Sequence, residues 1–194
     1  MNIIDISEEI WSNCKEVSFG DIEKWNDDTF TKKWFIDNDM KDVWDSKSQG
    51  WYWFICNISY PELKKIVKPD SLPLKGCNFS SVSEYNFNIF DIDKLCFCDL
   101  EDAVVLYNGH QKNVMSRIRE HFNLSNDGTG ALGIKHYPLS NRKWKVKIFT
   151  KESIKRLPFA IQEQVQKLIQ DKTGRCSIES AWRARNGWPV LCKE

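Results

Sequence analysis

The sequence has no apolar run that approaches the roughly 18 residues needed to cross a bilayer. Residues 1–16 are acidic overall, whereas a secretory signal peptide is basic and then apolar. We therefore expect a cytoplasmic protein without a membrane partner.

A disulfide or zinc framework is also missing. The seven cysteines are odd in number and irregularly spaced, which predicts reduced and mostly buried thiols. The one close pair, Cys96 and Cys98, has no second cysteine or histidine pair at zinc-ligand spacing. No internal repeat or low-complexity tract is visible. The chain therefore does not belong to the disulfide-rich or repeat classes.

No strong excess of one charge sign is present, but the charges are unevenly distributed. The net charge of +1 comes from 28 basic and 27 acidic side chains. Residues 1–48 carry twelve acidic and six basic side chains, which leaves fifteen acidic and twenty-two basic ones in residues 49–194. This split predicts an acidic extension on a mildly basic body. Such a body is compatible with a polyanionic partner without requiring one.

The apolar content is sufficient for one dense core. Nine Trp and eleven Phe in 194 residues predict a single domain with an aromatic interior. We place this domain at 49–194, with a helical extension at 1–48. Residues 57–100 contain Pro and Ser punctuation and long polar stretches, so we expect most of them to form a surface insertion.

Hydrophobic periodicity predicts an α/β fold with a small three-stranded sheet, mixed or antiparallel, flanked by helices. The strands are expected near 51–56, 103–107 and 144–149. The helices are expected near 113–123, 158–171 and 177–185. Asn108 and Gly109 predict a turn directly after the second strand, with positive φ at the glycine.

One motif joins the second strand to the helix that follows it. A Tyr-Asn-Gly triplet at 107–109 is followed by Arg117 and, one helical turn later, by His121. A Gly-Trp-Tyr triplet at 50–52 precedes it, and Glu179 stands on the last expected helix. This arrangement resembles the signature of the GIY-YIG nuclease family, in the branch whose helix carries a histidine. The resemblance extends from the first triplet to the C-terminus and implies the α/β architecture just described.

Four positions depart from the family pattern. Trp51 and Asn108 stand where the family has isoleucine, and the two half-motifs are much farther apart than is usual. The family commonly carries an asparagine near the position of Cys192. Either Asn186 replaces it from a different place, or that role is absent from this chain.

The resemblance assigns chemical roles to five residues. Tyr52 would be the general base or the group beside the attacking water, with Tyr107 and His121 tuning it or binding phosphate. Arg117 would clamp phosphate oxygens through its planar fork. Glu179 would anchor Mg²⁺ or Mn²⁺, which prefer hard oxygen ligands. A phenol needs positive charge nearby to act as a base at neutral pH, and Arg117, His121 and the metal would provide it.

Each of these residues also has an ordinary structural interpretation. Arg117 and His121 would be typical of a solvated helix face. Glu179 and Arg183, four residues apart, would be typical of a surface ion pair. Tyr52 would be a buried, hydrogen-bonded core tyrosine.

The most basic part of the chain is 135–156, which is the best candidate surface for DNA phosphates. The residues expected to contact DNA are Lys135, Arg142, Lys143, Lys145 and Lys147. Lys145 and Lys147 are expected to point outward from the third strand, because the apolar residues between them alternate toward the core. The alternative is a solvated lysine-rich strand face.

The expected function is that of a Mg²⁺-dependent DNA endonuclease. By analogy with small stand-alone members of the family, we expect a site-specific, restriction-type enzyme that cuts double-stranded DNA. Two cuts need two active sites, so we also expect a homodimer that uses part of residues 1–48. Two alternatives remain, namely a catalytically inactive DNA-binding module on the same fold and a scaffold protein that acts through its acidic extension.

Overall fold

The computed structural model describes residues 1–20, 25–42, 44, 45, 47–98, 103–124 and 130–193. Parts of the expected extension (21–24, 43, 46) and of the expected insertion (99, 100) lie outside the described residues. Among the helices that the structure describes, none has the length and apolar character of a membrane span.

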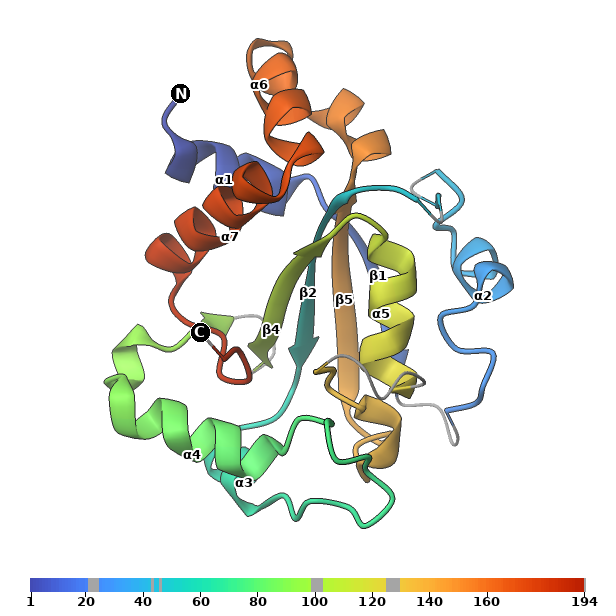
Figure 1. Ribbon diagram of the computed structural model, residues 1–194, viewed down its shortest axis with the longest axis vertical. Helices are drawn as coiled ribbons and strands as arrows, with labels where there is room; N and C mark the ends of the chain where they lie inside the picture. The colour runs from blue at the N-terminus through green and yellow to red at the C-terminus, as the bar shows by residue number, and fades with distance from the viewer. Residues whose placement is uncertain (21–24, 43, 46, 99–102, 125–129, 194) are drawn as a thin grey trace.

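Within the described residues, five strands form one antiparallel sheet in the order β1-β5-β2-β4-β3 (Figure 1). The strands are β1 (Lys15–Gly20), β2 (Gly50–Cys56), β3 (Phe97–Cys98), β4 (Ala103–Gln111) and β5 (Lys143–Thr150). The predicted α/β class and the three predicted strands are confirmed as β2, β4 and β5. The predicted strand number was wrong, because β1 and the two-residue β3 extend the sheet on both sides.

Seven α-helices surround this sheet in the described part of the chain. They are α1 (Ile3–Ser12), α2 (Lys32–Asp37), α3 (Tyr60–Lys65), α4 (Phe79–Ile89), α5 (Val114–Asn123), α6 (Phe159–Gln170) and α7 (Lys172–Asn186). The three predicted helices are confirmed as α5, α6 and α7. Helix α7 begins earlier than expected because the Asp171 side chain accepts a hydrogen bond from the backbone N–H of Gly174 and caps its first turn.

The N-terminal extension is not purely helical, so that prediction was wrong over Lys15–Gly20. This segment pairs with β5 along its whole length as strand β1. Val17 and Phe19 point into the core while Glu16 and Ser18 remain exposed, as expected for a strand with one buried face. The alternation was present in the sequence, and the pairing with β5 makes the extension part of the same core.

The two faces of the sheet carry two separate apolar cores. On one face, Tyr52 and Phe54 of β2 pack in the same cluster as Phe122 of α5. On the other face, Trp51 and Trp53 pack with Trp182 of α7, in a cluster that also includes α1 and α6 residues. Every residue of β2 is buried, which explains its continuous aromatic run. Figure 1 shows α5 on one side of the sheet and α1 with α7 on the other.

Strand β4 has a partly open edge, and this edge positions the candidate site. β3 pairs only with Ala103 and Val104, and the backbone N–H of Leu191 donates to the Leu106 carbonyl at 2.8 Å. Beyond that point β4 continues to Gln111, so the turn predicted at Asn108-Gly109 was wrong. Because side chains alternate along a strand, residues 107–111 can reach both faces of the sheet at this edge.

Candidate active site

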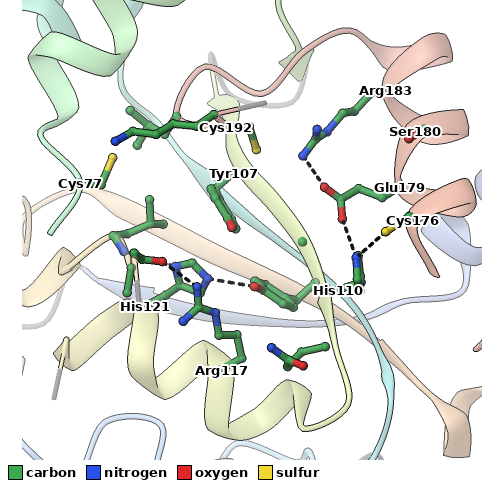
Figure 2. A pocket seen from close by; sticks show the side chains of 18 of the residues that line it. Cys77, Tyr107, His110, Arg117, His121, Cys176, Glu179, Ser180, Arg183 and Cys192 are labelled. Carbon is green, nitrogen blue, oxygen red and sulfur yellow. Dashed lines mark hydrogen bonds and ion pairs between the residues drawn. The ribbon is translucent and has the colours of Figure 1, made fainter. Parts of the chain in front are cut away.

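A cavity of about 500 Å³ opens at the edge of β4, between α5 and α7. The predicted catalytic residues all line it, namely Tyr52, Tyr107, Arg117, His121 and Glu179. They come from β2, β4, α5 and α7. Figure 2 shows Arg117 and His121 on the side of α5 and Glu179 on α7 across the cavity. The fold therefore brings together residues that are up to 127 positions apart in the sequence.

Tyr52 and His121 form the most deeply buried part of the α5 wall. The Tyr52 hydroxyl lies 2.9 Å from Nε2 of His121, and each residue is 1% exposed. The backbone N–H of Leu132 donates to Nδ1 of the same imidazole at 3.3 Å. Burial, followed by the charge of Arg117, lowers the pKa of His121 well below its usual value. His121 is therefore neutral at physiological pH, which excludes the interpretation of a solvated helix face for this residue.

These contacts define the direction of the hydrogen bond to Tyr52. A neutral imidazole that accepts at Nδ1 carries its proton on Nε2, so His121 donates to the Tyr52 oxygen. The phenol proton of Tyr52 then points away from His121. Burial raises the pKa of Tyr52 well above its usual value, and the neighbouring Tyr107 raises it further, while Arg117 lowers it. Tyr52 is therefore a neutral phenol at pH 7, supported by a histidine donor.

Gly109 allows Tyr52 and Tyr107 to approach each other. A Cβ atom at position 109 would lie 2.6 Å from the Tyr52 hydroxyl oxygen and 3.1 Å from the Tyr107 ring. The φ angle of Gly109 is not positive, so the expected role of this glycine in a left-handed turn was wrong. Its role is close packing, because the two aromatic rings meet with centroids 6.2 Å apart across its backbone.

Arg117 lies at the cavity, and its contacts include Glu120 and the backbone of Gly130. Its Nη1 donates to Glu120 at 2.6 Å, and its Nη2 donates to the Gly130 carbonyl, also at 2.6 Å. Its side chain is 14% exposed. Positive charge is thus held near Tyr52 and Tyr107, where a phosphate oxygen would accept a charge-assisted hydrogen bond.

Glu179 is the acidic group of the opposite, α7 wall. Its Oε1 accepts a hydrogen bond from Arg183, and its Oε2 lies 3.8 Å from Nε2 of His110. The Glu179 and Arg183 side chains are only 15% and 14% exposed, so they are not the exposed surface pair of the ordinary interpretation. Burial raises the pKa of the Glu179 carboxyl, and Arg183 opposes this shift.

His110 and Cys176 complete this wall. Nε2 of His110 lies 3.2 Å from Sγ of Cys176. Burial lowers the pKa of His110 to about 4, and the charges of Arg175, Lys172 and Arg183 act in the same direction. His110 is therefore neutral at physiological pH, and it adds no positive charge beside Glu179.

The donor set suits a hard cation held by one carboxylate. Among the described residues, no group of three or more His, Cys, Asp or Glu side chains forms a ready-made metal cage. Among the described residues that line the cavity, Glu179 is the only carboxylate, and one of its oxygens is not engaged by Arg183. Mg²⁺ is commonly held by one or two carboxylates and several waters, so Glu179 fits such an ion as its single protein ligand.

The predicted DNA-contacting residues lie outside the cavity, and most already have partners within the chain. Lys135 pairs with Asp27 at 3.1 Å, Arg142 with Glu62 at 2.6 Å, and Lys145 with Glu16 at 3.4 Å. The Lys147 ammonium lies 3.8 Å from the Trp11 ring centroid. Lys147 therefore does not point freely outward, because α1 covers this part of the sheet. Lys143 is exposed. Their contact with DNA stays a prediction.

Several cavity residues were missed by the sequence motif, namely Lys75, His110, Cys176, Arg183 and Lys193. His110 had a signal, because it follows Asn108 by two positions and shares its face of β4. The assumed turn at Asn108-Gly109 hid it. Of the two alternatives left open for the family asparagine, replacement by Asn186 is not favoured, because Asn186 donates to Glu8 at 2.6 Å and is not among the residues that line the cavity. Cys192 lines it instead.

Comparison of the chain with protein-family models, curated proteins and solved structures finds no match. The geometry of this cavity and the sequence motif whose residues line it are therefore the observations that bear on function.

Proposed function

We propose that this protein is a metal-dependent DNA endonuclease that hydrolyses phosphodiester bonds in this cavity. The observation that carries the proposal is the convergence of all five residues of the suspected GIY-YIG signature on one cavity. Four of them come from strands β2 and β4 and helix α5, which were expected to frame such a site. The fifth, Glu179, faces them from α7.

The roles follow from the two walls. Arg117 holds a phosphate oxygen at the mouth, and Tyr107 packs beside Tyr52 and His121 and fixes the position of the Tyr52 ring. His121 donates to the Tyr52 oxygen, so the Tyr52 proton is available to the attacking water or to the phosphate. Glu179 would hold the cation. Mg²⁺ or Mn²⁺ bound there would polarise a phosphate oxygen and lower the pKa of a bound water.

The neutral state of Tyr52 refines this mechanism. Its raised pKa makes it a hydrogen-bond donor in the absence of other charges. It can act as a base only after it has released its proton to solvent, and additional positive charge beside it would favour that release. Tyr52 therefore orients the water in the resting site, and its conversion to a base is coupled to binding of the cation and substrate.

The finer proposal is a restriction-type enzyme that cuts double-stranded DNA, and it rests on analogy with small family members. The structure weakens the case for a homodimer through residues 1–48. Apolar residues of the extension such as Ile6, Phe19 and Phe35 are buried within this chain. A dimer would need another surface.

Plasmid cleavage tests the proposal. Purified protein is incubated with supercoiled plasmid and phage DNA, with Mg²⁺, with Mn²⁺ or with EDTA. We expect nicked and linear products that require the cation and disappear in the Glu179→Gln variant. DNA binding without cleavage by wild-type protein would instead support the inactive DNA-binding module. The absence of both would support the scaffold.

A further inference from the structure

We infer that Arg183 and Asn108 are positioning residues that present one oxygen of Glu179 to a divalent cation. This inference deepens the proposed function and rests on it for the cleavage readout, although its main test measures cation binding alone. Asn108 departs from the family pattern, and neither residue was assigned a role by the sequence motif.

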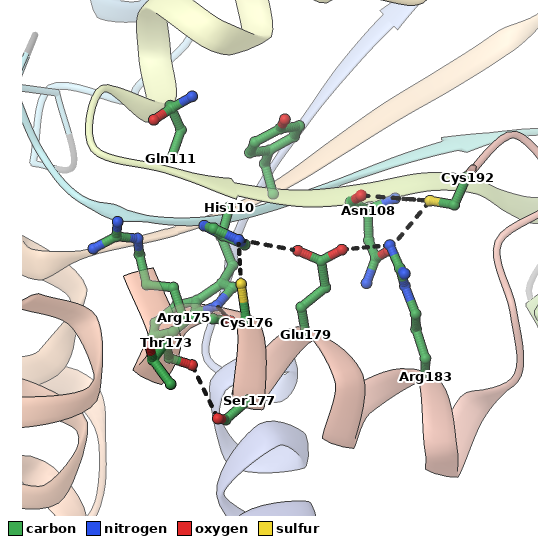
Figure 3. Close-up of polar contacts among 12 residues, drawn as sticks. Asn108, His110, Gln111, Thr173, Arg175, Cys176, Ser177, Glu179, Arg183 and Cys192 are labelled. Atoms are coloured by element: carbon green, nitrogen blue, oxygen red, sulfur yellow. Dashed lines mark hydrogen bonds and ion pairs between the residues drawn. The ribbon is translucent and has the colours of Figure 1, made fainter. Parts of the chain in front are cut away.

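The geometry holds Arg183 from three directions. Its Nε donates to Oδ1 of Asn108 at 2.9 Å, and its Nη2 donates to Oε1 of Glu179 (Figure 3). Its guanidinium carbon lies 4.4 Å from the Trp188 ring centroid. Two hydrogen bonds and the contact with the Trp188 ring restrict rotation of the guanidinium group.

Asn108 is buried and is held through its backbone and its side-chain oxygen. It is 1% exposed on β4, and its Oδ1 also accepts a hydrogen bond from Sγ of Cys192 at 3.4 Å. Its backbone is paired with Trp53 within the sheet. Asn108 therefore fixes the position of Arg183 relative to the sheet. Arg183 in turn fixes the position of the Glu179 carboxylate on α7 relative to the same strand.

The two carboxylate oxygens of Glu179 therefore have different partners. Arg183 occupies Oε1, while Oε2 faces His110 at 3.8 Å on the cavity side. Without Arg183, a buried carboxylate would lack its counter-charge and would be free to rotate. The affinity of a cation site with a single carboxylate depends strongly on the orientation of that carboxylate, because no second protein ligand holds the cation in place if the carboxylate rotates.

The pair also explains why Asn108 stands where the family has isoleucine. An apolar side chain at this position could not accept the Arg183 Nε–H, and a buried guanidinium nitrogen would lose its partner. The departure is therefore compensated within this chain by Arg183, and it does not indicate loss of chemistry.

The test titrates Mn²⁺ into the whole protein and follows free Mn²⁺ by electron paramagnetic resonance. Arg183→Lys retains the positive charge but cannot hold Asn108 and Glu179 together. Asn108→Leu retains Arg183 but removes its anchor. We expect each to weaken Mn²⁺ binding roughly 10- to 100-fold, as other changes around metal ligands do. Glu179→Gln should abolish binding, and Arg185→Lys, at an exposed position of the same helix, should not change it.

The outcomes separate the inference from the proposed function. Wild-type affinity in a folded Arg183→Lys protein would overturn the inference, as would tighter binding, which would mean that Arg183 competes with the cation. Absence of Mn²⁺ binding by the wild type would also overturn it. If Asn108→Leu fails to fold by circular dichroism, Arg183→Lys still decides. Mn²⁺ binding with the expected variant effects but no DNA cleavage would refute only the proposed endonuclease activity.

Discussion

The α5 wall of the cavity combines neutral aromatic groups with one cation, Arg117, whereas the α7 wall carries the Glu179–Arg183 ion pair. Tyr52, Tyr107 and His121 are held uncharged by burial. Glu179 and Arg183 retain opposite charges in a nearly buried setting because each stabilises the other. The first wall suits the placement of a water or proton, and the second suits the binding of a cation.

Because of this difference, we expect substitutions on the α7 wall to affect mainly the cleavage rate and substitutions on the α5 wall to affect the free energy of unfolding as well. On the α7 wall, charge is concentrated in few side chains, so a single change removes a function. On the α5 wall, packing and hydrogen bonding overlap, so a change affects stability as well.

The largest effect is expected for Glu179→Gln on the α7 wall. Cleavage should fall by several orders of magnitude, while DNA affinity stays the same or rises, because a negative charge facing phosphate is removed. Rates from single-turnover cleavage and affinities in EDTA measure the two effects. Glu163→Gln on the surface of α6 is the control. A folded Glu179→Gln protein with wild-type cleavage would refute the active site.

Arg117→Gln should reduce cleavage about 100-fold or more, as expected when one charged donor to the transition state is lost. Unlike Glu179→Gln, it should also weaken DNA binding, because a cation has been removed. Cleavage rates and DNA affinities are compared with those of Arg119→Gln, an exposed arginine two positions away. Equal behaviour of the two variants would assign Arg117 a structural role only.

Gly109→Ala should destabilise the α5 wall by about 1–3 kcal/mol, the usual cost of overpacking a core. The added Cβ would lie 2.6 Å from the buried Tyr52 hydroxyl. Urea unfolding measures the change. Gly130→Ala is the matched control, because a Cβ at that glycine meets nothing within 4 Å. Equal stabilities would mean that Tyr52 moves easily, contrary to a preorganised wall.

His121 should make stability depend on pH. Its folded-state pKa is lowered by burial, so below about pH 6.5 the unfolded chain binds a proton that the folded chain does not. Stability is fully present above this pH and is lost as pH falls, by up to about 1.4 kcal/mol per pH unit. The slope of the unfolding free energy between pH 7 and 5 should be shallower in His121→Gln. Parallel slopes would show that His121 is charged in the folded protein.

The smallest effect is expected outside the cavity. Replacing Lys143, Lys145 and Lys147 with Ala should flatten the salt dependence of DNA binding by only about one unit of slope, because two of them already have partners. Replacing the cavity lysines Lys75 and Lys193 should flatten it by up to about two units. A larger change from the β5 lysines than from the cavity lysines would indicate that DNA binds at the β5 surface.

The sequence predicted the elements that local patterns can specify. The β2, β4 and β5 strands and the α5, α6 and α7 helices were expected near their observed positions, because alternation and helical periodicity reflect which face each element buries. The errors have physical causes. The β1 strand was missed because its partner, β5, lies more than a hundred residues away, and pairing of that kind leaves only a short alternation in the sequence.

The turn expected at Asn108-Gly109 shows the limit of local reasoning. This dipeptide is a strong turn signal in isolation. In the folded protein, pairing with β2 extends the strand to Gln111, and the glycine serves contact with Tyr52 instead. Tertiary packing overrode the local preference.

By itself, the sequence determined the residue types of the candidate site, since the spacing of Tyr107, Arg117 and His121 on one strand and helix is a local property. Only the tertiary structure decided that Tyr52 and Glu179 join them in one cavity. It also determined that Arg183 is a partly buried partner of Glu179, whereas its spacing of four residues suggested a surface pair. Burial and counter-charge depend on the elements packed around a group, and these come from distant parts of the chain.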